Sequence, residues 1–396
     1  MSKPWPTVKL GEAITPAQRA EAPLLGTTYR QIGVKLWGEG AYERETMDGS
    51  QTKYAQLFRA EANDIIVNKI WARNGSVAVV PESLAGCFGS GEFPMFAPKR
   101  DRLESRWMHW ITKTRGFWAQ CDEKSQGTSG KNRIKPEQFL NVEIPLPPLA
   151  EQRRVVARIE ALAAQIHEAR TLRHQATEEA EALAGSSASK LFKNCRERQP
   201  IEAIAEVRGG IQKGPHRTPG ANPVRYLTVA HVHRNKILMD SPRYFEVSPE
   251  ELERWRLLRG DVLIIEGNGS ADQIGRTALF RGEIENCVHQ NHVIRIRPDQ
   301  QRLAPDFLNC FMNSPAGQDA VQSQSRTTSG LRSLSVGRIK AITVPIPPLT
   351  EQRRIVAELD ALQAEVDALK RLQTETAAEL AALLPAILDK AFKGEL

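Results

Sequence analysis

The chain contains the same phrase twice, 200 positions apart. Residues 144–162 read IPLPPLAEQRRVVARIEAL and residues 344–362 read VPIPPLTEQRRIVAELDAL, with 12 of 19 positions identical. The register holds without a gap through SKLFK (189–193) and DKAFK (389–393), and back to SQGTSG (125–130) and SRTTSG (325–330). A repeat this long is a domain with its connecting helix, not a short solenoid module. The chain is therefore expected to be a pseudo-dimer in one polypeptide, which suits a target with two halves.

The composition is that of an ordinary globular protein. At 396 residues, two to three domains with separate cores are expected. No apolar run is long enough to span a membrane, and the N-terminus MSKPWPTVKL lacks an apolar signal core, so we expect a cytoplasmic protein without a membrane partner. The five cysteines form no CxxC pair, and reduced, mostly buried thiols are expected.

Charge is distributed unevenly along the chain. Lys and Arg number 20 against 16 Asp and Glu in residues 1–143, and 19 against 15 in residues 199–343. The last segment, 344–396, carries 6 basic residues against 9 acidic ones. Basic domains on an acidic or neutral scaffold fit a polyanion partner for the domains and a protein partner for the scaffold.

After each Pro-Pro pair, apolar residues recur at steps of three and four, which predicts two long helices. The spacing predicts helices over about 151–184 and 351–384. The prolines before them predict an extended approach that ends at Ala150 or Thr350, and a helix-breaking residue, Gly185 or Pro385, is expected to end each helix. The predicted stripes also include Leu172, Leu183, Leu372 and Leu383. The seam residues expected to pair are Ile159, Leu162, Ile166, Leu359, Leu362, Val366 and Leu369. Each helix either packs only on its own domain or pairs with the other helix. We favour pairing because each two-faced helix has more apolar seam than one domain needs to cover, and an antiparallel coiled coil because the two units follow one another in the chain.

Four segments follow from the repeat. Residues 1–143 and 199–343 are predicted to be mixed α/β domains, and residues 144–198 and 344–396 each comprise a Pro-Pro approach and a long helix. Strands are predicted at 64–70, 77–80, 226–229, 261–267, 277–280 and 292–296, with Gly-rich turns at 74–76 and 268–270. Outside these anchors the two domains differ in sequence; the segment 35–42, for example, has no counterpart in the second domain. Similar scaffolds with different domains predict two different ligands.

No catalytic set is recognisable. The string at 127–132 lacks the spacing and the Ser/Thr of a phosphate loop, and there is no GxGxxG after a strand, no GxSxG elbow and no Asn/Asp-Pro-Pro-aromatic tetrapeptide. The histidine pairs 231/233 and 289/292 lack companion ligands at metal-binding spacing, so no metal is expected. We therefore expect a non-catalytic protein.

Basic and amide side chains gather in the predicted loops. Arg and Lys match guanine, and Asn and Gln match adenine, in the major groove, although each such residue can equally be ordinary surface polarity. The candidates for contact with DNA are Lys35, Lys69, Arg73, Lys131, Lys213, His216, Arg217, His231, His233, Arg234, Arg276, Gln290, Asn291, His292, Arg326 and Arg332.

The doubled PLPPLAEQRR/PIPPLTEQRR phrase ahead of a long helix resembles the specificity subunit of type I restriction-modification systems. Phrases at 209–213, 226–230, 261–263, 275–276 and 290–292, and at 33–40 and 64–69, are similar to framework phrases of that family's target recognition domains. The resemblance implies an α+β fold with two mixed α/β target recognition domains joined by two helices. Each domain would read one half of a split, asymmetric double-stranded DNA site, and the helices would set the spacer.

The resemblance also implies partners. Two methyltransferase subunits would dock on the helices, and motor-nuclease subunits would join them to form an adenine-specific DNA methyltransferase and ATP-dependent endonuclease. S-adenosylmethionine, ATP and Mg would belong to those partners, and this chain would bind none of them. Two alternatives come from other classes. The first is a stand-alone DNA-binding or DNA-modifying protein with a dimerisation arm, and the missing catalytic motifs argue against it. The second is a repressor-like protein. The domains of a repressor would normally be alike, whereas these differ.

Overall fold

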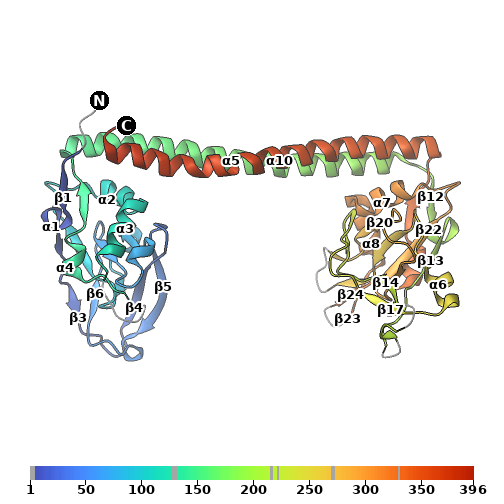
Figure 1. Ribbon diagram of the computed structural model, residues 1–396, viewed down its shortest axis with the longest axis horizontal. Coiled ribbons are helices and arrows are strands. Elements are labelled where there is room, and N and C mark those ends of the chain that lie inside the picture. Colours follow the sequence, from blue (N-terminus) through green and yellow to red (C-terminus); the bar gives the residue numbers. More distant parts are fainter. Residues whose placement is uncertain (1–4, 126–131, 215–216, 221–222, 269–272, 329–330) are drawn as a thin grey trace. The chain divides into compact units, whose positions relative to one another are not determined.

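The computed structural model describes residues 5–125, 132–214, 217–220, 223–268, 273–328 and 331–396. They form two compact units (Figure 1). The first unit contains residues 1–172 and 374–396, and the second contains residues 173–373. Each unit therefore holds one of the two large domains together with a segment of both long helices.

The first unit is built around a four-stranded antiparallel sheet. Its strand order is β2 (Ile14–Pro16), β10 (Met95–Pro98), β7 (Ile65–Val67) and β8 (Val77–Val79). Ile65 and Val67 pack in one core with the helices, whereas Ile66 packs in a second core with Ile32 and Val34. Because successive side chains point to opposite faces, burial on both faces explains why this strand is uninterruptedly apolar.

A second sheet of five strands covers the other face of this framework. Its order is β3 (Ala20–Glu21), β6 (Leu57–Arg59), β9 (Phe88–Gly89), β4 (Thr28–Val34) and β5 (Ala41–Asp48). The helical face carries α1 (Leu10–Ala13), α2 (Ser105–Ile111), α3 (Arg115–Glu123) and α4 (Pro136–Phe139), with the antiparallel pair β1 (Thr7–Lys9) and β11 (Glu143–Pro145). The long β4–β5 hairpin carries the segment that has no counterpart in the second domain.

The second unit repeats this framework. Its antiparallel sheet has the order β13 (Ala205–Arg208), β22 (Val293–Pro298), β18 (Val262–Ile265) and β20 (Thr277–Leu279). The elements α7 (Pro305–Asn313), α8 (Pro315–Gln324), α9 (Val336–Ala341), β12 (Arg198–Pro200) and β25 (Thr343–Pro345) follow the same sequence order as their counterparts. The predicted strands in both domains are confirmed, with bounds shifted by a few residues.

The two units differ in what is added to the framework. The second unit carries the short sheets β17 (Tyr244–Glu246)–β14 (Pro223–Leu227)–β21 (Val288–His289), β15 (Val232–His233)–β16 (Lys236–Ile237) and β19 (Gly267–Asn268)–β24 (Leu331–Ser333)–β23 (Arg326–Thr328), together with α6 (Pro249–Trp255). The sequence divergence between the domains therefore lies mainly in these added elements, whereas the framework is shared.

The long helices are α5 (Leu149–Asn194) and α10 (Leu349–Lys393), and they extend beyond the predicted ends. The prediction that Gly185 and Pro385 end the helices is wrong; Pro385 lies inside α10. The continuation buries Ala188 and Phe192 in the second domain's core, and Leu388 and Ala391 in the first. Burying a large apolar side chain stabilises by about 1.5–3 kcal/mol, which offsets a helix-interior Gly at about 1 kcal/mol or Pro at about 3 kcal/mol.

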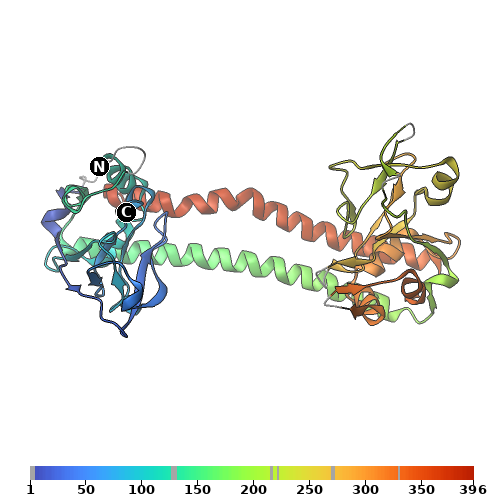
Figure 2. The same ribbon diagram turned by 90° about the horizontal axis from the view of Figure 1, so that it is seen from below.

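Within each unit the two helix segments run antiparallel (Figure 2). In the first unit, Arg154 donates to the backbone oxygen of Leu396 (3.2 Å) and Arg170 to that of Leu380 (3.5 Å). In the second unit, Gln373 donates to the backbone oxygen of Arg173 (2.8 Å) and accepts from the Thr177 hydroxyl (3.0 Å). The helices both pair with each other and pack on the domains, so the two alternatives considered for them hold together.

The contact line of the helices differs in part from the predicted stripe. Ile159, Ile166 and Val366 are buried, and Leu162, Leu359, Leu362 and Leu369 are half-buried. The placement of Leu172, Leu183, Leu372 and Leu383 in the seam is wrong, because all four are exposed. The less exposed side of α5 instead recurs every eleven residues, at Val155, Ile166, Thr177 and Ala188. Residues eleven apart stay on one side of a nearly straight helix, whereas residues seven apart rotate progressively around it.

A buried glutamine ties the start of each long helix to its domain. Gln152 accepts from the backbone N–H of Glu104 (2.9 Å) and donates to the backbone oxygens of Arg102 and Pro147 (both 2.8 Å). Gln352 repeats this arrangement with Ala304, Arg302 and Pro347, all at 2.8 Å. Both glutamines are completely buried. The repeated EQRR phrase therefore encodes the joint between domain and helix.

Replacing Gln152 or Gln352 with Leu should destabilise the corresponding unit. The substitution leaves one N–H and two carbonyl groups without their partner, and each buried unsatisfied group costs about 1–3 kcal/mol. Urea unfolding followed by circular dichroism would measure the loss. Gln165→Leu on the exposed side of α5 is the matched control and should change little; equal stability of all three variants would contradict this role.

Candidate nucleic-acid interface

In the first unit, the loop around Lys35 is a rigid turn held by a second predicted turn. Trp37 N–H donates to the backbone oxygen of Asn74 (2.7 Å), and Gly38 N–H donates to that of Gly75 (3.1 Å). The ammonium of Lys113 donates to the Gly38 oxygen (2.6 Å). Trp37 has a positive φ of 58° and remains exposed. The structure thus joins two turns that the sequence placed far apart and presents Lys35 at their edge.

Lys69 and Arg73 follow β7 on one short segment. The Nζ of Lys69 lies 3.4 Å from Glu92 Oε1, and the Arg73 guanidinium lies 5.9 Å from the centre of the Trp71 ring. The Asn68 side chain accepts from the backbone N–H groups of Ile70 (3.1 Å) and Trp71 (3.3 Å) and so fixes this turn. Lys131 lies outside the described residues.

In the second unit, the loop 211–213 and the loop 290–292 lie side by side. Ile211 bridges to Gln290, and Asn291 N–H donates to the Ile211 oxygen (2.9 Å). Lys213 and His292 are exposed, and the His292 Nδ1 lies 3.1 Å from Glu266. These loops bring together Lys213, Gln290, Asn291 and His292, which we call the second-unit loop cluster.

Strands β24 and β23 adjoin this cluster. Leu334 N–H donates to the backbone oxygen of Glu266 (2.7 Å), and Asn268 in β19 pairs with Arg332 in β24. Arg326 in β23 pairs with Ser333. The backbones of both arginines therefore belong to the sheet beside the cluster, while His216 lies outside the described residues.

Several other candidates already have partners within the domain. Arg217 forms two bonds of 2.6 Å with Glu251. Arg276 is buried and donates to the backbone oxygens of Val232 (2.7 Å) and Val229 (2.8 Å), and Arg234 donates to Gln318 (3.0 Å). The buried His231 accepts from Thr228 N–H (2.9 Å), and the exposed His233 lies 3.1 Å from the Ala230 oxygen. The His233 side chain is exposed, whereas the other four residues hold the loops in place through these contacts. Sequence spacing alone does not reveal the partners of their side chains.

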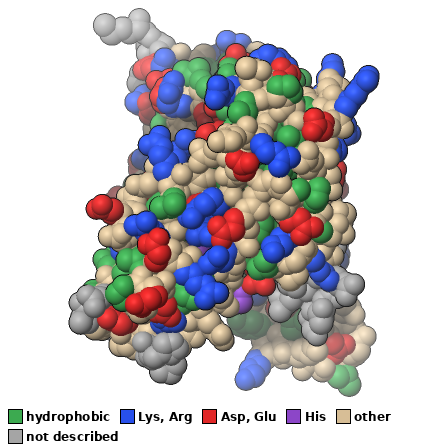
Figure 3. Space-filling view, turned by 90° about the vertical axis from the view of Figure 1, so that its right-hand side faces the viewer, with side chains coloured by type: hydrophobic (Ala, Val, Ile, Leu, Met, Phe, Trp, Pro, Cys, Tyr) green, Lys and Arg blue, Asp and Glu red, His purple; other side chains and the backbone are tan. Residues whose placement is uncertain are grey.

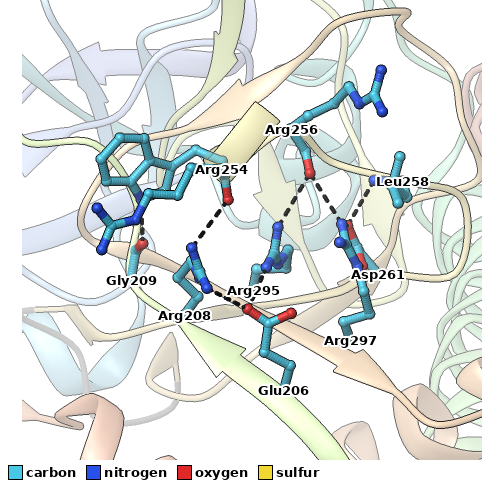
Figure 4. A network of polar contacts seen from close by, with 10 residues as sticks. Glu206, Arg208, Gly209, Arg254, Arg256, Leu258, Asp261, Arg295 and Arg297 are labelled. Carbon is cyan, nitrogen blue, oxygen red and sulfur yellow. Dashed lines mark hydrogen bonds and ion pairs between the residues drawn. The ribbon is translucent and has the colours of Figure 1, made fainter. Parts of the chain in front are cut away.

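A network of arginines on strands β13 and β22 of the four-stranded sheet also has its partners within the domain (Figure 4). Arg297 clamps the buried Asp261 at 2.7 and 2.8 Å, and Arg295 reaches Glu206 at 3.0 Å. In the first unit the equivalent buried Asp64 is clamped by Arg19 instead. The aspartate of each domain's Asp-Ile/Val strand phrase is therefore the buried half of an ion pair. Figure 3 shows Lys and Arg interspersed with Asp and Glu on the viewed face rather than in one basic patch.

His289 lies in the core beneath the second-unit loop cluster. Its Nδ1 lies 2.5 Å from the backbone oxygen of Val293, and its Nε2 is buried without a partner among the described residues. Burial lowers the pKa of His289 to about 4, and nearby Arg295 and Arg297 act in the same direction. In the first unit, burial likewise lowers the pKa of His109 to about 4.

These histidines predict loss of stability in acid. Because the folded pKa of His289 is about 4, below the ordinary 6.5, the unfolded chain takes up the proton first. The stabilisation is complete above about pH 6.5 and is lost as the pH falls towards 4. At pH 5 the preferential protonation of this ring in the unfolded chain lowers the free energy of unfolding by about 2 kcal/mol. Urea unfolding at pH 7.5 and 5 should show a smaller loss for His289→Asn than for the native chain. The exposed control His233→Asn should keep the native pH dependence, and an equal loss in all three proteins would contradict the assignment.

Among the described residues, no three His, Cys, Asp or Glu side chains form a group able to hold a metal ion. No helix in the described ranges is both long and apolar enough to cross a membrane.

Comparison with known proteins decides the family. The sequence profile of the type I restriction modification DNA specificity domain matches residues 3–174 and 234–378. The chain belongs to this family. Two matches, one in each half, agree with the repeated framework and with the resemblance drawn from the EQRR phrase.

Relatives and solved structures agree with that membership. The type I restriction enzyme EcoKI specificity subunit of Escherichia coli K12 is 29% identical over 281 residues, covering 67% of this chain and 60% of the relative. The StySPI specificity subunit of Salmonella potsdam is 26% identical over the same shares of the two chains. The chain thus spans about 60% of the length of these curated relatives.

The similarity to solved structures extends over the whole chain. The HsdS subunit from Thermoanaerobacter tengcongensis matches with a TM-score of 0.66 and 25% identity, covering 100% of this chain and 98% of that one. A chain from a study of complex assembly and conformational transition of the type I R-M system matches with a TM-score of 0.71 and 23% identity, covering 100% and 99%. The second match bears on the fold alone.

Proposed function

We propose that this chain is the non-catalytic, DNA-reading specificity subunit of a type I restriction-modification complex. The observation that carries the proposal is the repeated framework with different additions: the two four-stranded sheets share one strand order, whereas the added sheets differ. One scaffold used twice with two reading surfaces suits a DNA site whose two halves have different sequences. A repressor-like homodimer would instead present two equal surfaces to a palindrome.

The proposed contacts with DNA lie on the loops. In the second unit they are Lys213, Gln290, Asn291 and His292, with Arg326 and Arg332 on the adjoining strands. The exposed His233 of β15 and His216 remain candidates from the sequence. In the first unit they are Lys35, Lys69, Arg73 and Lys131. We leave out Arg217, His231, Arg234 and Arg276 because their side chains form hydrogen bonds of 3.0 Å or shorter inside the domain. The contacts of the retained Lys69 and His292 with carboxylates are longer, 3.4 and 3.1 Å.

The helices are the proposed docking surface for two methyltransferase subunits. Each unit presents two exposed leucines, one from each helix: Leu172 and Leu383 in the first, Leu372 and Leu183 in the second. Exposed apolar side chains at repeated positions suit two copies of one partner. S-adenosylmethionine, ATP and Mg belong in this proposal to the methyltransferase and motor-nuclease subunits, and the complex would methylate adenine and cut DNA with ATP.

Exchanging one domain should change one half of the methylated sequence. The chain alone should transfer no methyl group from radiolabelled S-adenosylmethionine. With its methyltransferase, sequencing of methylated DNA should reveal a site in two parts. Replacing residues 199–343 with the equivalent domain of a relative should alter one part only, because the added sheets are separate in the two units.

The same assay resolves single contacts. Asn291→Ala should cost about 1–3 kcal/mol and relax one base position if the residue reads a base, and it should weaken all sequences alike if it contacts phosphate. The exposed Arg259→Ala, outside the loop cluster, is the control. Methyl transfer by the chain alone, or changes in both half-sites after the exchange, would refute the proposal and favour a stand-alone DNA-modifying protein.

Lengthening both helices should lengthen the spacer of the DNA site. Arg173 faces Gln373, so residues 162–172 of α5 face residues 374–384 of α10. Duplicating both segments adds eleven residues to each helix, which matches the eleven-residue return of the buried side. The addition is about 16 Å at 1.5 Å per residue, or about five base pairs at 3.4 Å each.

Selection from DNA with randomised spacers would measure this change. The half-site sequences should stay as they are while the preferred spacer grows. Duplication in one helix alone is the control and should disrupt the pairing, seen as a loss of cooperative unfolding. An unchanged spacer in a folded double-duplication protein would leave the helices as docking surfaces only.

A further inference from the structure

We propose that a pocket in the first unit receives a DNA base turned out of the duplex. This inference rests on the proposed function, because it requires the first unit to face DNA. The pocket has a volume of about 220 Å³ and is lined in part by residues of β4, β5, β6 and β9 of the five-stranded sheet. Its walls include the rings of Tyr54, Trp71, Phe88 and Phe93, and its polar lining includes Glu92 and Arg44.

The size and walls of the pocket suit a single planar group. Pockets for drug-sized ligands are about 300–1,000 Å³, so 220 Å³ is small for a peptide segment. Tyr54 and Trp71 are 53% and 44% exposed, so two rings stand at the pocket with free surface. Bases of every kind stack on aromatic side chains. The Asn68 hydrogen bonds hold the backbone of the turn that carries Trp71, so the attachment point of the ring is fixed.

Glu92 gives the pocket a preference. Its Oε1 lies 3.4 Å from Lys69 and 3.3 Å from Arg133. Its Oε2 is buried and has no hydrogen-bond partner among the described residues. A buried acceptor without a partner is costly, and a ligand that supplies an N–H donor removes that cost. The exocyclic amines of cytosine and adenine are such donors.

The charges around the pocket favour a base that is part of DNA. Lys69 and Arg133 flank Glu92, Arg73 lies over the Trp71 ring, and Arg44 lines the pocket itself. Arg44 also lies 3.8 Å from Glu45. Four cations therefore stand against two carboxylates at the pocket, so the rim carries excess positive charge. A base in DNA brings two phosphate groups to such a rim, which gives it an electrostatic advantage over a free base.

An apolar turn stands close to the pocket wall. Leu24 and Leu25 are 63% and 84% exposed. Leu24 N–H donates to the Tyr29 hydroxyl (3.1 Å), and the Tyr29 ring meets Phe88 edge-on with centroids 5.0 Å apart. The Leu24 oxygen lies against Gly49, where an added Cβ would come within 2.2 Å of it. The turn is therefore fixed to the pocket wall, and apolar side chains of this kind fill the gap in the base stack when a base leaves it.

The experiment uses the complex of the full chain with its methyltransferase on its own DNA site. A methyltransferase extrudes its own target adenine, so the test concerns a second position. Within the half-site read by the first unit, one base other than the methylated adenine should become unpaired on binding, detected by permanganate for thymine and chloroacetaldehyde for adenine and cytosine. An abasic site opposite the extruded base removes the pairing that must be broken, so it should tighten binding of the native complex about tenfold. Both effects should disappear in Trp71→Ala and decrease in Leu25→Ser.

Glu92→Gln keeps the shape of the side chain and serves as the second variant. It should still bind the site but lose the preference for a base with an amino group at the extruded position. Tyr244→Ala, an aromatic side chain of the second unit that is 44% exposed like Trp71 and does not line the pocket, is the matched control and should keep the reactive base. Methylation of the unmodified site by each variant shows separately that the proposed function is intact.

Three results would overturn the inference. They are a half-site with no reactive position besides the methylated adenine in the native complex, a second reactive base that persists in Trp71→Ala, and an opposite abasic site that leaves affinity unchanged. Binding of free nucleosides to the DNA-free chain, lost in Trp71→Ala without any reactive base in DNA, would assign the pocket to a free nucleoside instead.

Discussion

The buried amide of Gln152, and its counterpart Gln352, sets the joint on which the rest of the molecule depends. Two prolines bring the chain to the helix in an extended form, and the glutamine side chain then joins the first helical turn to two backbone segments of the domain. An amide suits this position because it donates twice and accepts at the same time. Since the same three kinds of bond recur in the second unit, the direction in which each helix leaves its domain is fixed by the same contacts.

The framework tolerates change where its contacts can be supplied from elsewhere. The buried aspartate ahead of the central strand is kept in both units, but Arg19 clamps it in the first and Arg297 in the second. The ionic partner thus comes from different elements in the two units, while the sheet order is the same. Such freedom allows the surface sheets to diverge while the core and the helix joint stay constant.

Much of this architecture could be predicted from sequence because it is written in local patterns. The apolar strands at 65–67 and 262–265, the Pro-Pro approaches and the antiparallel helices all follow from spacing and repeat. The helix ends could not, because Pro385 is tolerated only through the burial of Leu388 and Ala391 in a domain far away in sequence. The seam was misplaced at Leu172 and Leu372 for a related reason: a seven-residue pattern and an eleven-residue pattern agree over the first turns and separate only later.

The candidate site was less predictable than the fold. Composition identified loops rich in Arg, His and Asn, and the structure brings Lys213, Asn291 and His292 together. Composition does not distinguish an arginine that faces outward from one that, like Arg276, donates hydrogen bonds to the carbonyl groups of two loop residues. That distinction depends on tertiary contacts. The pocket beside Trp71 could not be predicted from the sequence, because its walls come from five separate segments of the chain. The unpartnered Glu92 Oε2 that points to a ligand becomes visible only in the folded structure.

The interleaved composition of the first unit has a consequence for how the molecule is made. The Trp5 indole donates to the backbone oxygen of Ala391, 386 residues further on, and the Trp107 ring packs on Phe392. At roughly 5–20 residues per second, a ribosome needs roughly 20–80 seconds between making the two partners of the first contact. During that interval the earlier domain waits with part of its apolar interior open to solvent, while the second domain, made later, finds most of its own packing partners sooner. The unit translated first is thus the last to close.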